Sequence, residues 1–242
     1  MMRYTNRMTP EEEKLSTDAY NVIKARNGKD TIEFFLESGK YQPSNTPIAL
    51  FMAGSPGAGK TEVSKSFIKQ FKDAPIRIDA DEIRAVCEGY TGDNAHIFQR
   101  AATKGVNILQ DHALHNSINY ILDGTFAYGS VETNIERALK YNFLVKIWFV
   151  YQSPETAWNF TKIREEDEDR HVSKEVFVNA FFRARENVGI VKEKFNKDIE
   201  LNLLVKNYET GEEKFKLNIN AKELDQLTNC GYSEEELMTN LI

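Results

Sequence analysis

Residues 54–61 read Gly-Ser-Pro-Gly-Ala-Gly-Lys-Thr, which matches the phosphate-loop pattern G-x-x-x-x-G-K-[ST] in full. Glycine lacks the Cβ atom that would obstruct backbone N–H groups turning inward around phosphate oxygens. In such a loop, Lys60 can reach the β- and γ-phosphates and the Thr61 hydroxyl can hold Mg²⁺. The sequence therefore predicts a nucleotide-binding loop made of Gly54, Ser55, Pro56, Gly57, Ala58, Gly59, Lys60 and Thr61, with Thr61 as the metal ligand.

The bulk properties limit the class of protein. A chain of 242 residues suits one α/β domain with appendages. The net charge of −6 makes a nucleic-acid partner unfavourable, although a local basic groove would still be compatible with it. The two cysteines, Cys87 and Cys230, have no metal-like spacing, which favours a reducing compartment. No apolar stretch resembles a signal peptide or a membrane span, so we expect a cytoplasmic protein without a membrane partner.

Strand-like and helix-like stretches alternate through the middle of the chain, which predicts an α/β fold with a five-stranded, mainly parallel sheet and helices on both faces. The expected strands are Ile48–Ala53, Ile76–Asp79, Tyr120–Asp123, Phe143–Tyr151 and Ile199–Val205. The expected helices are Lys60–Phe71, Asp81–Glu88, Asp93–Asn116, Val131–Lys140, Pro154–Arg164 and Lys174–Lys197. A short β segment at Lys214–Asn218 can close the sheet.

Both ends of the chain are expected to be helical. At the N-terminus, Thr9 followed by Pro10 and three glutamates is typical of a helix start. A second helix is predicted at Lys29–Ser38, before a linker. We therefore predict a helical extension over residues 1–45, which pads the sheet rather than blocking a cleft. The phosphate-loop domain spans 46–220, and one C-terminal helix packs on it over 221–242.

Two carboxylates follow the second predicted strand. Ligands of open α/β sheets bind at the carboxyl ends of strands, so Asp79 and Asp81 should lie on the same edge as the phosphate loop. Transfer of a phosphoryl group to a hydroxyl needs a base near the attacking oxygen. Asp81 is the better candidate for this base, and Asp79 could hold Mg²⁺ through water or brace the loop. The simpler alternative is that Asp81 only caps the helix that follows.

The third predicted strand ends in Leu-Asp-Gly-Thr at 122–125. Asp123 occupies the position of the second acidic motif of phosphate-loop proteins, where the acid supports Mg²⁺ directly or through water. A strand that merely stops at a polar turn would look similar. We assign Asp79, Arg84, Asp123 and Thr125 to substrate binding.

A charged segment, residues 162–174, follows the fourth strand and its helix. Such a run can simply be a solvated surface. Small kinases, however, carry a mobile lid at this place, and its arginines stabilise charge on the transferring phosphoryl group. We predict that Arg164 and Arg170 serve this role together with Lys60 and Asp81 as the catalytic residues.

With these motifs in this order, the chain resembles the zeta toxin family of phosphate-loop kinases. The resemblance rests on the phosphate loop, on Ile-Asp-Ala-Asp-Glu-Ile-Arg at 78–84, on residues 122–125, and on the lid residues 163–166 and 170–174. It implies a P-loop kinase fold. It also implies ATP and Mg²⁺ at Lys60 and Thr61, Asp81 as base, and Arg164 and Arg170 on the transferring phosphate. It also implies phosphorylation of UDP-N-acetylglucosamine, and a small antitoxin that blocks the ATP site.

The resemblance is incomplete in the motif that lies near the phosphate acceptor in the family. Family members usually carry Glu before Gly-Thr and a basic residue soon after, whereas this chain has Asp123 and then Phe-Ala-Tyr at 126–128. The acceptor is therefore expected to be a UDP-sugar or a related small metabolite. Two alternatives are a polynucleotide 5′-hydroxyl kinase, which a basic channel leading to Asp81 would favour, and a nucleotide-gated binding module with little turnover.

Overall fold

The computed structural model describes residues 8–168, 171–208, 210–228 and 231–241. The strands are β1 (Ile48–Ala53), β2 (Ile76–Asp79), β3 (Tyr120–Asp123), β4 (Leu144–Tyr151), β5 (Ile199–Asn207) and β6 (Glu212–Lys216). The helices are α1 (Pro10–Lys24), α2 (Lys29–Phe35), α3 (Lys60–Ile68), α4 (Ala80–Ala85), α5 (Ala95–His115), α6 (Val131–Lys140), α7 (Pro154–Glu168), α8 (Lys174–Phe195), α9 (Ala221–Thr228) and α10 (Glu234–Asn240), with 3₁₀ turns η1 (Ala25–Gly28) and η2 (Asn196–Asp198).

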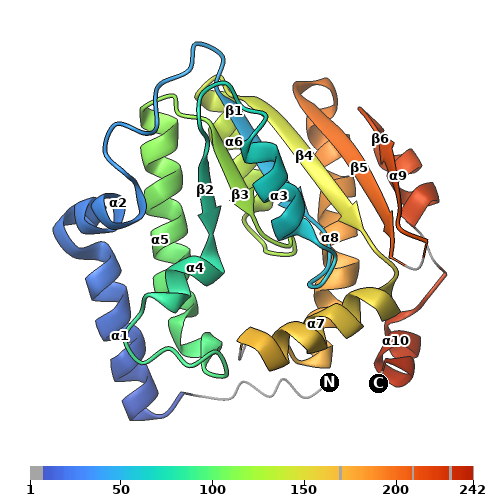
Figure 1. Ribbon diagram of the computed structural model, residues 1–242, viewed down its shortest axis with the longest axis horizontal. Coiled ribbons are helices and arrows are strands. Elements are labelled where there is room, and N and C mark those ends of the chain that lie inside the picture. Colours follow the sequence, from blue (N-terminus) through green and yellow to red (C-terminus); the bar gives the residue numbers. More distant parts are fainter. Residues whose placement is uncertain (1–7, 169–170, 209, 229–230, 242) are drawn as a thin grey trace.

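One sheet runs through the molecule in the order β2-β3-β1-β4-β5-β6 (Figure 1). The five predicted strands are present and pair in parallel. The described residues form a sixth strand, β6, which pairs antiparallel with β5 at the edge of the sheet. The predicted five-stranded sheet is therefore one strand short. Strand β6 begins two residues before the predicted β segment, and its residues are all exposed, as expected for an edge.

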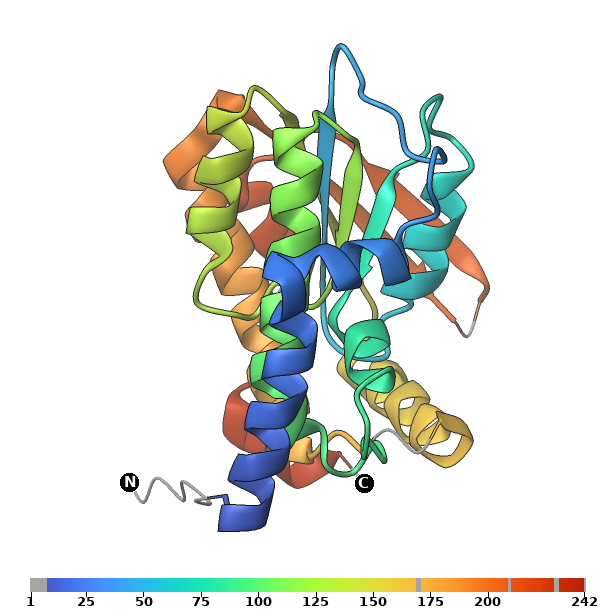
Figure 2. The ribbon, with the colours of Figure 1, turned by 90° about the vertical axis from the view of Figure 1, so that its left-hand side faces the viewer.

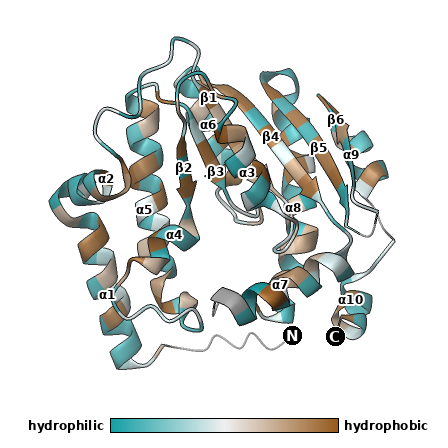
Figure 3. Cartoon of the chain, viewed as in Figure 1, coloured by the Kyte–Doolittle hydropathy of each residue, from teal (hydrophilic) through white to brown (hydrophobic). Residues whose placement is uncertain are grey.

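Both faces of the sheet are covered, and the side chains of β1 alternate between them. Ala49, Phe51 and Ala53 belong to the larger core cluster, which includes residues of α5, α6 and α8. Leu50 and Met52 belong to a smaller cluster on the α3 side. Figure 2 shows the sheet edge-on between these two layers. A parallel sheet that helices cover on both sides favours nearly continuous apolar strands, and β1 is apolar throughout. Strands β2, β4 and β5 also include hydrophilic residues, which are teal in Figure 3.

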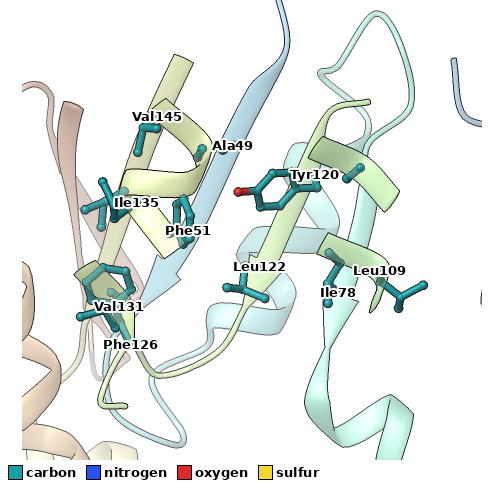
Figure 4. Packing of buried hydrophobic residues seen from close by; sticks show 14 of the residues in the cluster. Ala49, Phe51, Ile78, Leu109, Tyr120, Leu122, Phe126, Val131, Ile135 and Val145 are labelled. Atoms are coloured by element: carbon teal, nitrogen blue, oxygen red, sulfur yellow. The ribbon is translucent and has the colours of Figure 1, made fainter. Parts of the chain in front are cut away.

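Aromatic rings fill the larger core, where strands and helices meet (Figure 4). Phe51 lies between Tyr120 and Phe126, with ring centroids 5.9 and 6.1 Å away in edge-to-face contacts. All three rings are almost completely buried. This packing supports β1 and β3, and therefore the loops that leave their carboxyl ends.

The N-terminal helices are present as predicted, but they pack on α5 rather than directly on the sheet. Thr9 caps α1 and forms a reciprocal capping box with Glu12. Ala19 and Ile23 of α1 are buried and belong to the larger core cluster. The core therefore extends past α5 to the helix that packs on it. The predicted division at residue 45 stays a prediction.

The single predicted C-terminal helix is wrong: α9 and α10 are separate helices. Gly231 has a positive φ of 73°, which glycine adopts without strain. Ser233 then begins α10, because its side chain accepts a hydrogen bond from Glu236 N and the Glu236 side chain returns to the cap backbone. The turn and the capping box were both present in the sequence.

Among the described residues, none of the helices combines the length and the apolar character that crossing a membrane requires. Of the two cysteines, Cys87 is buried, and Cys230 lies outside the described residues.

Candidate active site

The phosphate loop connects β1 to α3, and two of its glycines lie where any side chain would collide with backbone. Gly57 has a φ of +70°, and a Cβ there would lie 1.9 Å from the carbonyl oxygen of Ala157 on α7. A Cβ on Gly54 would lie 2.3 Å from the carbonyl oxygen of Val150 on β4. The loop therefore fits against its neighbours only without side chains at these two positions.

Lys60 begins α3 and is folded back onto the loop. Its side-chain amine donates a hydrogen bond to the carbonyl oxygen of Ser55 at 2.6 Å, and the residue is 9% exposed. Gly54 N donates to the carbonyl oxygen of Thr125 at 3.1 Å, which ties the loop to the turn after β3. One hydrogen bond within the loop and one to the turn after β3 therefore hold the phosphate loop in shape.

One cleft brings most of the predicted site residues together. It is lined by Pro56, Gly57, Gly59, Lys60, Thr61, Asp79, Asp81, Asp123, Gly124, Thr125, Thr161, Arg164 and Val172. Gly54, Ser55 and Ala58 of the loop do not line this cleft, and Ser55 and Ala58 are buried. The cleft lies at the carboxyl ends of β1, β2 and β3, where the sequence predicted a ligand site.

The two strand-end acids face each other across neighbouring strands. Asp79 on β2 and Asp123 on β3 are partners in the parallel register. Asp79 is also the N-cap of α4, because its Oδ1 accepts a hydrogen bond from Asp81 N at 2.8 Å. The alternative in which Asp81 caps this helix is therefore wrong, since Asp79 does so. The Asp81 side chain is left on the first turn of α4, lining the cleft.

Asp81 forms an ion pair with Arg84, one turn further along α4. Arg84 also donates to the Gln99 Oε1 on α5 at 3.0 Å. It does not line the cleft itself, and its Nε is buried with no hydrogen-bond partner in the described part of the protein. Arg84 therefore orients Asp81 from behind and retains one unsatisfied donor.

Sequence reasoning missed Arg77, which joins the acids of the site. Its guanidinium donates to Asp79 Oδ2 at 2.6 Å, and to Asp123 Oδ2 through Nη2 at 2.7 Å and Nε at 3.0 Å. It also pairs with Glu82. Ser64 on α3 donates to the same Asp123 oxygen at 2.6 Å. Arg77 thus links β2, β3 and the start of α4.

Burial and charge act in opposite directions on this cluster. Burial alone would lower the pKa of Arg77, but the carboxylates of Asp123 and Asp79 outweigh it and the pKa is raised. Burial raises the pKa of Asp79, and the nearby carboxylates of Asp81 and Asp123 raise it further, while Arg77 opposes them. Arg77 is therefore the charged group that limits the rise in the pKa of Asp79.

Only part of the predicted lid, residues 162–174, lies within the described residues. The helix predicted to end at Arg164 continues to Glu168, so Arg164 lies on α7 and lines the cleft. Glu165 of the same helix pairs with Lys162 and with His171. Arg170 lies outside the described residues. Among the described residues, Arg164 therefore lines the cleft from a helix.

Structures of known proteins share this fold at low sequence identity. A chain from the PezAT chromosomal toxin-antitoxin system of Streptococcus pneumoniae is similar with a TM-score of 0.63 and 20% identity, covering 96% of this chain and 94% of that one. The AvrRxo1-ORF1:-ORF2 complex with ATP has a TM-score of 0.59 and 16% identity, over 92% of this chain and 74% of that one. The same complex with sulphate ions gives 0.58 and 16%, over 90% and 72%.

Among curated proteins, no match to this sequence was found. The family comparison is decisive, because the family model described as zeta toxin matches residues 33–212, about three quarters of the chain and all of the cleft. The chain therefore belongs to the zeta toxin family, whose members are P-loop kinase-like phosphotransferases.

Proposed function

We propose that the protein is a Mg²⁺-ATP-dependent kinase that transfers the γ-phosphate to a hydroxyl of a UDP-sugar or a related small metabolite. The observation that carries the proposal is the single cleft shared by Lys60 and Thr61, Asp81, and Arg164. A phosphate cradle, a base and a cation at one site are what phosphoryl transfer to a hydroxyl requires.

Several features of the cleft fit a nucleotide and a metal ion. The loop leaves no room for a Cβ at Gly57, which is the geometry that lets backbone N–H groups approach phosphate oxygens. The Thr61 hydroxyl and the carboxylates of Asp79 and Asp123 line the cleft and are the oxygen donors that Mg²⁺ prefers. When bound, Mg²⁺ would neutralise negative charge on the phosphate oxygens.

The chemical step assigns one role to each charged group. As the acceptor oxygen forms its bond to the γ-phosphorus, the bond from that phosphorus to the bridging oxygen breaks and ADP leaves. The hydroxyl proton passes to the Asp81 carboxylate, which its ion pair with Arg84 orients. Lys60 and Arg164 stabilise the charge spread over the phosphoryl oxygens, and we assign the same role to Arg170.

The acceptor would bind beside the strand-end acids. We assign Asp79, Asp123 and Thr125, which line the cleft, to this subsite. Arg84, also predicted to bind substrate, does not line the cleft, so we assign it an indirect role through its ion pair with Asp81. Asp123 already accepts hydrogen bonds from Arg77 and Ser64 on one oxygen, so only its other oxygen is available to the acceptor or to water around Mg²⁺.

The decisive measurement is ATP consumption by the purified protein against UDP-sugars, nucleosides and 5′-hydroxyl oligonucleotides, with the native chain and Asp81→Asn compared. We expect turnover with one UDP-sugar and its loss in the variant, whereas Asp225→Asn, an exposed carboxylate on α9, should behave as native. Full activity of Asp81→Asn would remove Asp81 from the mechanism. Turnover with oligonucleotides alone would favour the polynucleotide kinase, and ATP binding without turnover the binding module.

We also propose that the protein acts in the cytoplasm, where ATP is supplied, as a toxin with an antitoxin partner. The support is family membership together with similar structures described as a toxin-antitoxin system and as a two-component complex. Co-expression with the product of the neighbouring gene should relieve growth arrest by the native chain. If the Asp81→Asn variant arrests growth as strongly as the native chain, the toxicity does not come from the proposed reaction.

A further inference from the structure

A second hollow lies away from the active site, between α1, α2 and the segment that follows α4. Its volume is about 730 Å³, within the range of about 300–1,000 Å³ of pockets that hold ligands. Figure 2 shows α1 lying along α5, with α4 beside them. Nothing in the proposed reaction uses this groove, and it shares no lining residue with the cleft.

The groove exposes large apolar side chains from three elements. Val22 on α1 and Phe34 on α2 are each 69% exposed, and Val86 after α4 is 45% exposed. Solvent-exposed residues of this size are ordinary when scattered, but together along one groove they mark an interaction site.

The charge around the groove has a single sign. Asp18, Asp30 and Glu88 line it, and the described residues that line it include no lysine, arginine or histidine. Asp30 is paired with Arg26 at 2.8 Å, whereas Asp18 and Glu88 form no ion pair within the described part of the chain. These two carboxylates lie on opposite walls, on α1 and after α4. A partner that fits the groove should therefore carry positive charge on both sides of its apolar surface.

The wall formed by α1 has the shape of a helix-binding surface. Leu15, Ala19 and Val22 are spaced by four and three residues, which places them on one face of α1 over a length of about 10 Å. Grooves of this kind between helices accept amphipathic helices through apolar anchors at the same spacing. We propose that the groove binds an amphipathic helix of a partner protein, with an apolar ridge between rows of Lys or Arg residues.

The groove is physically linked to the candidate active site through α4. Cys87, which lines the groove, donates from its backbone N to the carbonyl oxygen of Arg84 at 3.0 Å. Arg84 in turn holds Asp81 in the cleft. An occupant of the groove therefore contacts the segment that ends the helix carrying Asp81. Binding itself does not depend on the proposed kinase activity.

The test uses two fluorescein-labelled synthetic helices of about 14 residues, roughly 21 Å long. Both carry the same leucine ridge, flanked by Lys in one and by Glu in the other. Fluorescence anisotropy measures their binding to the native chain, to Phe34→Gln, and to the double variant Asp18→Asn with Glu88→Gln. The matched controls are Val176→Gln, a 58% exposed apolar residue on α8, and Glu234→Gln with Glu235→Gln on α10.

We expect the Lys helix to bind the native chain with micromolar affinity. Its affinity should be at least tenfold lower for Phe34→Gln and at least fivefold lower for the double variant Asp18→Asn with Glu88→Gln. Its affinity for both control variants should equal that for the native chain. The Glu helix should bind at least tenfold more weakly. Absence of Lys-helix binding, equal binding to Phe34→Gln, or equal binding of both helices would each overturn the proposal. Sedimentation that detects a dimer lost in Phe34→Gln would also overturn it, because a second copy would then be the occupant.

Discussion

Replacing Arg77 by methionine tests whether one buried cation holds the acid cluster together. The Arg77 side chain is 9% exposed, and its partners Asp123 and Asp79 are 4% and 14% exposed. Methionine keeps most of the volume but removes every donor. The two carboxylates would then remain buried without the guanidinium that now binds both of them.

The size of the effect follows from this burial. Removing one partner of a buried ion pair costs about 3–5 kcal/mol, because the remaining charge loses its compensation. The pair with Glu82 adds little, since that side chain is 53% exposed. We therefore expect Arg77→Met to lower the free energy of unfolding by about 3–5 kcal/mol. Arg77→Lys keeps the charge but cannot bridge two carboxylates as a fork does, so about 1–3 kcal/mol is expected.

Urea unfolding followed by tryptophan fluorescence measures these differences. The control is Arg26→Met, which breaks an ion pair with Asp30 in which the two side chains are 61% and 43% exposed and should cost less than about 1 kcal/mol. Adding Asp123→Asn to Arg77→Met should restore part of the loss, since one uncompensated charge is removed. A cost below about 1 kcal/mol for Arg77→Met, equal to the control, would refute the role of Arg77 as the counter-ion of this cluster.

Three further predictions concern single residues of the site. Lys60→Ala should lower kcat about a thousandfold or more in an ATP-consumption assay, a loss of about 4 kcal/mol or more of transition-state stabilisation; loss of nucleotide affinity alone would favour the binding module. Gly57→Ala should abolish binding of a fluorescent ATP analogue, because its Cβ collides with the Ala157 carbonyl, whereas Gly129→Ala, which has open space, should bind as native. The raised pKa of Asp79 means that the folded protein holds this proton more tightly than the unfolded chain, so the free energy of unfolding should fall as the pH rises from about 4 through that pKa. Asp79→Asn should flatten this part of a urea-midpoint profile, and an unchanged slope would contradict the assignment.

Local patterns predicted the elements that position the candidate site. The bounds of β1, β2 and β3 match those expected from the sequence, because each is a short apolar or alternating segment that ends at a glycine or an acid. From those ends alone it followed that Asp79 and Asp123 lie on the edge that carries the phosphate loop, and their pairing in the register confirms this. Helix ends were less accurate: α4 stops at Ala85, three residues before the predicted end. Apolar spacing continues past that point, but it does not determine where the backbone leaves the helix.

Arg77 could not be predicted in the same way, because its partners come from strand order. Residues 76–79 alternate between apolar and polar, and alternation by itself predicts that Arg77 points to solvent. Only the placement of β2 beside β3, with α3 alongside, brings Asp123 and Ser64 to its guanidinium. There was one usable signal: a strand in a sheet covered by helices on both faces rarely keeps an arginine unless a buried acid compensates it. Asp79 and Asp123, the two acids assigned to substrate binding at that edge, were the strand-end carboxylates of the predicted parallel strands. Two carboxylates expected side by side at a covered sheet edge favour a cation between them, and Arg77 is the nearest basic residue in the second strand.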